Sequence, residues 1–274
     1  MNLVLFKAVL GIYIAGMLGN LTYLVSPREY LARTSLYIMV VGFALHLAWL
    51  VTRTYEAGHV PVTNLHESLS FFALAVIAVY LILAKKFGVK ALGAFISPVA
   101  VIFMLLAASR PGEVGTLPPI LHSTWLVFHP VFSFFGNALF ALAFGAGAMY
   151  LIQEKEVKSK KLGGIFRRLP SLEVLDKMNF YCLIFGFPLL TLGLISGSIW
   201  AQAAWKVSPY SSLEPKLLWA AVTWLIYASL FSGRLIAGWR GKKAAVFALV
   251  GFGAVMLGYL VVSLYLSSQH SFIK

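Results

Sequence analysis

The sequence predicts an all-α fold, a polytopic bundle of about eight helices that spans a lipid bilayer with both termini on the outer face. Of the 274 residues, 60% are apolar and 11% are charged, which is more apolar surface than one soluble core could bury. Apolar runs near the roughly 20 residues that a spanning helix requires recur along the chain. Lysine and arginine gather in alternate connections between these runs, as expected of a membrane protein with many spans.

The first apolar run, residues 3–25, could be mistaken for a signal peptide because it is N-terminal and carries Lys7. It is too long for a signal-peptide core and lacks a small-residue cleavage pattern, so we interpret it as a retained span. Pro98 and Pro188 fall inside later spans, where each can kink its helix. The remaining expected spans are 36–52, 69–84, 91–109, 125–152, 180–200, 217–233 and 244–266.

The formal net charge of +13 follows the expected topology. Basic residues cluster after the first, third, fifth and seventh spans, and by the positive-inside rule these four connections are cytoplasmic. This pattern favours a topology signal over nucleic-acid binding, with headgroup or partner binding by the basic 153–178 loop as the alternative. No internal repeat is visible, so residues 1–274 are expected to form one membrane domain. The clusters contain Arg28, Arg33, Lys85, Lys86, Lys90, Lys155, Lys158, Lys160, Lys161, Arg167, Arg168, Lys177, Arg234, Arg240, Lys242 and Lys243.

None of the six histidines falls in a connection expected to be cytoplasmic. Two lie in the loop after the second span, one lies before the fifth span, one lies a turn into the fifth span, and one follows the eighth. The sixth lies within the second span, toward its outer half. In this order they are His59, His66, His122, His129, His270 and His46.

An ionisable side chain at membrane depth is costly, so His46 and His129 are the histidines that most need an explanation. For His46 we favour a buried hydrogen bond to a neighbouring helix. His129 is shallow enough to ligate a group at the outer interface. His129 and His270 together would offer two neutral imidazoles from separate helix ends, a common way to hold haem iron at both faces.

Other metal and redox chemistries are excluded by the spacing. There is no His-Glu-x-x-His motif, and Cys182 is the only cysteine, so the usual zinc sites and an internal disulfide are ruled out. The lack of Cys-x-x-Cys also excludes a thioredoxin-like reductant and a covalent c-type cytochrome. We expect Cys182 to be a small packing residue.

The external segment 200–219 is rich in tryptophan, with Trp200, Trp205 and Trp219. One interpretation is an aromatic belt at the membrane interface, which tryptophan favours because it is amphipathic. The alternative is a flat apolar platform for a planar ligand. In that case external cations could neutralise the carboxylates of the ligand, and the candidates are Lys206, Lys216, Arg53 and Arg110.

Four segments, in order and on the expected side of the membrane, resemble the cytochrome c assembly proteins of the CcsA and HemX type. They are VTRTYEAGHVPVTNLHESL, WLVFH ending in His129, GSIWAQAAW followed by LEPKLLWAAVTWLIYA, and QHSF with His270. The resemblance covers residues 36 to 272. In the first segment the matching residues are Arg53, Gly58, His59, Pro61, Asn64, Glu67 and Ser68.

The resemblance implies a multi-pass protein of the cell membrane that handles haem, with haem b as the cofactor. It implies His129 and His270 as axial ligands of the iron. The residues implied to line the cofactor are Trp200, Trp205, Trp219 and Glu214. Implied partners are apocytochrome c and a CcsB-like membrane protein, with activity only as part of a cytochrome c synthase complex.

Three departures from the family pattern affect this expectation. Glu214 replaces an aspartate, and the Trp-x-Trp that precedes it in the family is missing. Ser232 stands where synthase-grade members carry a histidine late in the seventh span, and His66 stands where a tyrosine is usual. A HemX-like accessory or regulatory protein of haem biosynthesis, without catalytic activity, is therefore the alternative. A small-solute transporter would predict two related halves with broken helices, which the sequence does not contain.

Overall fold

A computed structural model describes residues 2–110, 125–160, 163–164, 166–207 and 215–258. These ranges contain eight helices and no strand, which confirms the predicted all-α fold. The helices follow the expected spans in order, although α2, α3, α5 and α6 extend several residues beyond them. They are α1 (Asn2–Val25), α2 (Glu29–Ala57), α3 (Leu65–Phe87), α4 (Leu92–Ala108), α5 (Trp125–Lys158), α6 (Leu172–Val207), α7 (Pro215–Leu235) and α8 (Lys242–Leu257).

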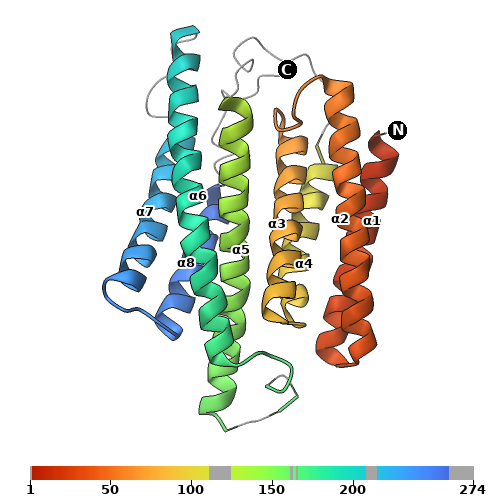
Figure 1. Cartoon of the computed structure of the whole chain (residues 1–274), viewed down its shortest axis with the longest axis vertical. Coiled ribbons are helices and arrows are strands. Elements are labelled where there is room, and N and C mark those ends of the chain that lie inside the picture. The colour runs from red at the N-terminus through yellow and green to blue at the C-terminus, as the bar shows by residue number, and fades with distance from the viewer. Residues whose placement is uncertain (1, 111–124, 161–162, 165, 208–214, 259–274) are drawn as a thin grey trace.

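Successive helices run in opposite directions, so that the chain passes up and down the bundle (Figure 1). The α1–α2, α3–α4, α5–α6 and α7–α8 connections, which carry the clustered basic residues, all lie at one end of the bundle. We call this the basic end and the opposite end the outer end. The positive-inside rule assigns the basic end to the cytoplasmic side.

The outer surfaces of the helices are apolar. Within the part of the chain that the structure describes, six helices are long and apolar enough to cross a membrane, and α4 is a shorter apolar helix of 17 residues. Large exposed aliphatic side chains such as Leu18, Val51, Ile82 and Ile195 fit a surface that faces lipid. The protein is thus a multi-pass membrane protein.

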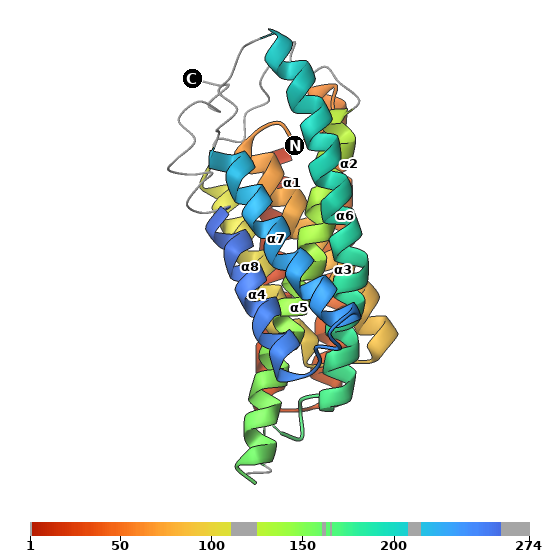
Figure 2. The same cartoon turned by 90° about the vertical axis from the view of Figure 1, so that its left-hand side faces the viewer.

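Two helices are much longer than the bilayer requires. α5 has 34 residues and α6 has 36, so each is roughly 50 Å long at the rise of an α-helix. Figures 1 and 2 show α6 projecting past its neighbours at the outer end and α5 projecting at the basic end. These extensions reach beyond the expected spans 125–152 and 180–200, since α5 ends at Lys158 and α6 ends at Val207.

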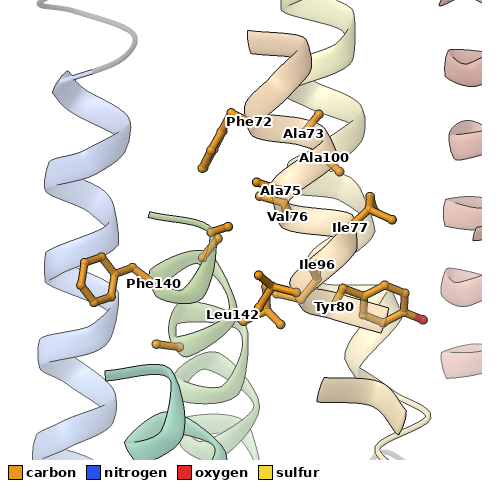
Figure 3. Close-up of a cluster of buried hydrophobic side chains, with 14 of the residues drawn as sticks. Phe72, Ala73, Ala75, Val76, Ile77, Tyr80, Ile96, Ala100, Phe140 and Leu142 are labelled. Carbon is orange, nitrogen blue, oxygen red and sulfur yellow. The ribbon is translucent and has the colours of Figure 1, made fainter. Parts of the chain in front are cut away.

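The core of the bundle lies around α3, most of whose residues are buried. Alanines alternate with large side chains on this helix, which lets α4 and α5 approach it closely (Figure 3). Phe72 of α3 packs edge-to-face on Phe103 of α4, with 4.5 Å between ring centroids. Buried aromatic pairs of this kind add to the stabilisation that the buried area provides.

The connection between α2 and α3 is ordered by residues of the motif that begins with Arg53. Gly58 ends α2 with a φ of 71°, in the left-handed region that favours glycine. The Asn64 side chain accepts a hydrogen bond from the backbone N–H of Glu67 at 2.9 Å and so caps the start of α3. Three matching residues of the motif therefore have structural roles in the turn.

A buried ion pair joins this turn to α2. Arg53 Nη2 lies 2.9 Å from Glu67 Oε1, and the side chains are only 4% and 1% exposed. The other carboxylate oxygen of Glu67 accepts hydrogen bonds from the backbone N–H and the hydroxyl of Thr63, at 3.1 and 2.9 Å. The carboxylate is thus paired and hydrogen-bonded at both oxygens, as a buried charge requires.

The structure confirms the prediction that His46 forms a buried hydrogen bond to a neighbouring helix. It is fully buried on α2, where Nδ1 lies 3.2 Å from the Tyr13 hydroxyl of α1 and Nε2 lies 2.9 Å from the Ser70 hydroxyl of α3. Both ring nitrogens are therefore satisfied by neighbouring helices. This arrangement is typical of a structural histidine in a membrane bundle.

The basic end is held together by three polar contacts between distant segments. Arg234 of α7 forms a bidentate pair with Asp176 of α6, with N–O distances of 2.8 and 2.6 Å. Asp176 also accepts a hydrogen bond from the backbone N–H of Gly241, just before α8. Arg168, in the α5–α6 connection, donates a hydrogen bond to the Leu24 carbonyl at the end of α1. Within the described residues, these contacts join α6, α7 and α8 to one another and α1 to the connection that precedes α6.

Candidate functional site

His129 lies in the second turn of α5, at the outer end of the bundle, and is half-buried. Its neighbour Pro130 lacks a backbone N–H and fixes φ, which a helix tolerates best near its start. The position agrees with the shallow placement predicted from the sequence. It puts the imidazole beside Gly193 and Gly197 of α6.

Small residues let α5 and α6 pack closely over the turns next to His129. A Cβ atom added to Gly136 of α5 would lie 2.9 Å from the backbone nitrogen of Leu190 on α6. A Cβ at Gly193 of α6 would lie 3.0 Å from the backbone nitrogen of Ser133 on α5. Glycines at such positions permit tight packing of helix backbones in membranes. The result is a rigid support for the side chains at the outer end.

The His129 ring occupies the space over Gly197. A Cβ at position 197 would lie 2.6 Å from Nδ1 and 2.7 Å from Cε1 of the imidazole, so a larger residue there must displace the ring. The Gly193 carbonyl oxygen lies 2.7 Å from Nδ1, and the Ser133 hydroxyl lies at 3.5 Å. The ring is therefore fixed on one side by the backbone of α6.

The carbonyl contact determines the tautomer of His129. A carbonyl oxygen can only accept, so Nδ1 carries the hydrogen and donates it to Gly193. In a neutral ring the lone pair then belongs to Nε2, and within the described residues Nε2 has no hydrogen-bond partner. A histidine that donates one N–H to a backbone carbonyl and keeps the other nitrogen unprotonated is arranged as metal-ligating histidines are.

Trp200 and Trp219 lie on two different helices, toward the outer end. Trp200 follows Gly197 by three residues, which places it on the same side of α6 as the His129 contact. Its indole N–H is buried and has no hydrogen-bond partner among the described residues. In contrast, the Trp219 indole N–H donates to the Ala254 carbonyl of α8 at 2.7 Å. Trp219 is thus fixed against α8, and its N–H is already used.

Several predicted site residues cannot be placed relative to His129. His270, His122 and Glu214 lie outside the described residues. Trp205 lies in the last turns of α6, where only the backbone is described. The expected external segment is largely helical, because residues 200–207 extend α6 and residues 215–219 begin α7.

Two residues lie elsewhere than predicted. His66 was expected in a loop, but it lies in the first turn of α3, where it is buried and Nδ1 lies 2.8 Å from the Ala107 carbonyl. The start of α3 was placed too late because the capping residues before it look like a loop. Arg53 was a candidate to neutralise a ligand carboxylate, but its guanidinium is buried against Glu67.

Two further sequence expectations concern the interior of the membrane. Cys182 is buried among apolar side chains, which confirms its expected packing role. Ser232, at the position of the membrane histidine of synthase-grade proteins, is exposed on the surface of α7.

Among the residues placed in the structure, no group of three or more His, Cys, Asp or Glu could hold a metal ion. A site that takes its iron ligands from two histidines is compatible with that result.

Comparisons with known proteins agree with the resemblance seen in the sequence. A family model described as "Cytochrome C assembly protein" matches residues 62–270. The protein named "Cytochrome c biogenesis protein CcsA" of Chlamydomonas reinhardtii is 32% identical over 268 residues, covering 94% of this chain and 71% of its own length. That of Synechococcus elongatus is 32% identical over 279 residues, with 85% of each chain covered. That of Microcystis aeruginosa is 33% identical over 273 residues, with 82% of this chain and 83% of its own covered.

Proposed function

The chain belongs to the cytochrome c assembly protein family, and from this membership we propose that it acts in cytochrome c assembly by binding haem at the outer face of the cell membrane. In this proposal His129 and His270 ligate the iron of haem b, and the outer tryptophans and Glu214 flank the porphyrin. The protein would present the haem to apocytochrome c together with a CcsB-like membrane partner.

The observation that carries the proposal is the fixed tautomer of His129. Its Nδ1–H is donated to the Gly193 carbonyl, which leaves the Nε2 lone pair available at the outer end of α5. The indole N–H of Trp200, on the same side of α6, is buried and has no partner among the residues that the structure places, so a polar ligand group could satisfy it. Both features fit a ligand that has a metal and carboxylate groups.

The residues of this chain contribute binding and orientation. When bound, haem supplies the vinyl groups that become attached to cysteine thiols in a c-type cytochrome. Rigid placement between α5 and α6 would hold the porphyrin at a fixed depth and angle. Such positioning is worth several kcal/mol when two reactants are brought together, on the order of 7 or more in favourable cases. No side chain of this protein is proposed to transfer a proton or an electron.

A second candidate function is supported by Ser232. Because this position faces outward from α7, a haem ligated from there would not be enclosed by the bundle. Passage of haem through the membrane part of this protein is therefore not part of the proposal. A HemX-like accessory role, in which the protein affects the levels of haem-biosynthesis enzymes without chemistry, is the alternative.

Deletion of the gene separates the two functions. If the protein acts in cytochrome c assembly, the deletion strain should lose most haem-stained c-type cytochromes while its early tetrapyrrole enzymes stay at normal levels. Reintroduction of the intact gene should restore the cytochromes. Normal c-type cytochromes together with an altered amount of an early tetrapyrrole enzyme would reject the assembly role in favour of the accessory one.

Gly197 provides a test of how His129 is held. We expect Gly197→Ala to displace the imidazole and weaken its hydrogen bond to Gly193, which should lower haem retention about tenfold or more, as loss of outer-shell support does at metal sites. Retention is measured by the haem absorbance of the purified protein per unit of protein. Gly253→Ala is the matched control, because a Cβ there meets nothing within 4 Å. Equal retention in the two variants would show that the position of the ring is unimportant.

A further inference from the structure

A cleft on α2 lies at the basic end, far along the helix from its ion pair with α3. It is an open hollow of about 440 Å³ between side chains of this one helix, lined by Glu29, Tyr30, Arg33, Thr34 and Tyr37. These residues lie on one side of the first two turns of α2, and that side faces away from the bundle.

The cleft lies at the level of the lipid headgroups. α2 has 29 residues, roughly 43 Å, which is longer than the hydrocarbon core of about 30 Å. The apolar part expected to cross that core begins at residue 36, so Tyr30 and Arg33 lie on its cytoplasmic side and Tyr37 lies at its border. Tyr30 and Tyr37 are 57% and 65% exposed, as interfacial tyrosines are.

The charges in the cleft leave Arg33 available to an anion. The only carboxylate in the lining, Glu29, is bound at 2.8 Å by Lys90 from the α3–α4 connection. Arg33 lies 3.9 Å from the other oxygen of Glu29, too far for a hydrogen bond, and its side chain is 69% exposed. Lys90 thus neutralises the carboxylate, and the guanidinium of Arg33 keeps donors that can point into the cleft.

The surface beyond the cleft is aliphatic. Val40, Val41, Leu47 and Val51 continue the exposed side of α2 toward the outer end. An acyl chain can lie along such a surface, whereas a soluble phosphate compound gains nothing from it. The combination of a cation and hydroxyls at headgroup level with an aliphatic strip beyond them matches a phospholipid.

We propose that the cleft binds an anionic phospholipid of the inner leaflet, with its phosphate on Arg33 and the hydroxyls of Tyr30 and Tyr37, and an acyl chain along the aliphatic strip of α2. Guanidinium suits phosphate because the two can form parallel hydrogen bonds. The site is independent of haem and of the outer end of the bundle. It would anchor α2 at a defined depth and orientation in the membrane.

The test is native mass spectrometry of the detergent-purified protein titrated with phosphatidylglycerol or phosphatidylcholine. We expect tighter retention of phosphatidylglycerol, a loss of about tenfold for Arg33→Gln, and a smaller loss of roughly threefold for Tyr37→Phe. Arg240→Gln is the matched control, because Arg240 is an exposed arginine of the α7–α8 connection at the same end. Its effect should stay within about twofold, since a distant exposed charge is screened.

Three results would overturn the proposal. Equal retention of the two lipids would mean that the headgroup charge is not recognised. Equal losses in Arg33→Gln and Arg240→Gln would mean that only the overall positive charge attracts the lipid. Binding of glycerol phosphate as tight as that of phosphatidylglycerol would identify a soluble phosphate compound as the ligand. Tyr37→Phe keeps the test valid if the arginine variant fails to fold.

Discussion

Replacement of His129 by alanine is expected to abolish haem retention by the purified protein. Wild type should show the absorption spectrum of six-coordinate haem, because two imidazoles fill both axial positions. His129→Ala removes one of these ligands and the ring that the Gly193 carbonyl orients. The remaining haem should be below about a tenth of the wild-type amount, and any that stays bound should show a five-coordinate spectrum.

His59→Ala is the matched control for this experiment. His59 lies in the α2–α3 connection at the same end of the bundle, where Nδ1 lies 3.1 Å from the Val60 carbonyl. Its removal should leave the haem spectrum unchanged. If His129→Ala and wild type carry equal amounts of six-coordinate haem, His129 is not an iron ligand and the proposed site is wrong.

Replacement of Glu67 by alanine is expected to destabilise the protein severely, by about 3 to 5 kcal/mol. The change leaves the guanidinium of Arg53 buried without its carboxylate. It also removes the acceptor for the hydroxyl and backbone N–H of Thr63. We expect a lower yield of folded protein and a much lower Tm in detergent.

Glu173→Ala is the matched control, because it removes an ion pair that is exposed to water instead of one that is buried. Glu173 lies in the first turn of α6 and pairs with Lys177 at 2.6 Å, but both side chains are mostly exposed. Its removal should leave the Tm close to that of the wild type, because water screens exposed pairs. Similar Tm values for the two variants would refute the structural role assigned to Glu67.

Most of the fold could be predicted from the sequence because lipid imposes simple rules. A spanning segment must be apolar, helical and about 20 residues long, so composition alone locates it. The basic residues then orient the connections, and the four that were predicted to share one side do lie at one end. The hydrogen bonds of His46 were predictable for the same reason, since a polar ring in the membrane needs partners.

Packing between helices was harder to predict. α3 is the central helix, but its apolar sequence resembles that of helices that face lipid, because the two environments are equally apolar. The start of α3 was missed because capping by Asn64 depends on a hydrogen bond between residues that also suit a loop. The spacing of four residues between Gly193 and Gly197 indicates the close approach of α5 to α6, because small residues one turn apart permit tight helix packing.

The candidate site was predictable as a set of residue types but not as a geometry. His129 is at the expected end of the bundle, and its depth follows from its place in the apolar run. Its tautomer follows from a backbone carbonyl 64 residues away in the sequence, which no pattern reveals. The same holds for Trp219, whose hydrogen bond to Ala254 depends on how α7 meets α8.

The hydrogen bond from Arg168 to the Leu24 carbonyl joins residues that are 144 positions apart. During synthesis α1 leaves the ribosome long before Arg168 is translated, so this bond cannot form until five helices have entered the bilayer. The Leu24 carbonyl must meanwhile be hydrated. A chain that ends before Arg168 would therefore lack the side chain that satisfies the Leu24 carbonyl at the end of α1.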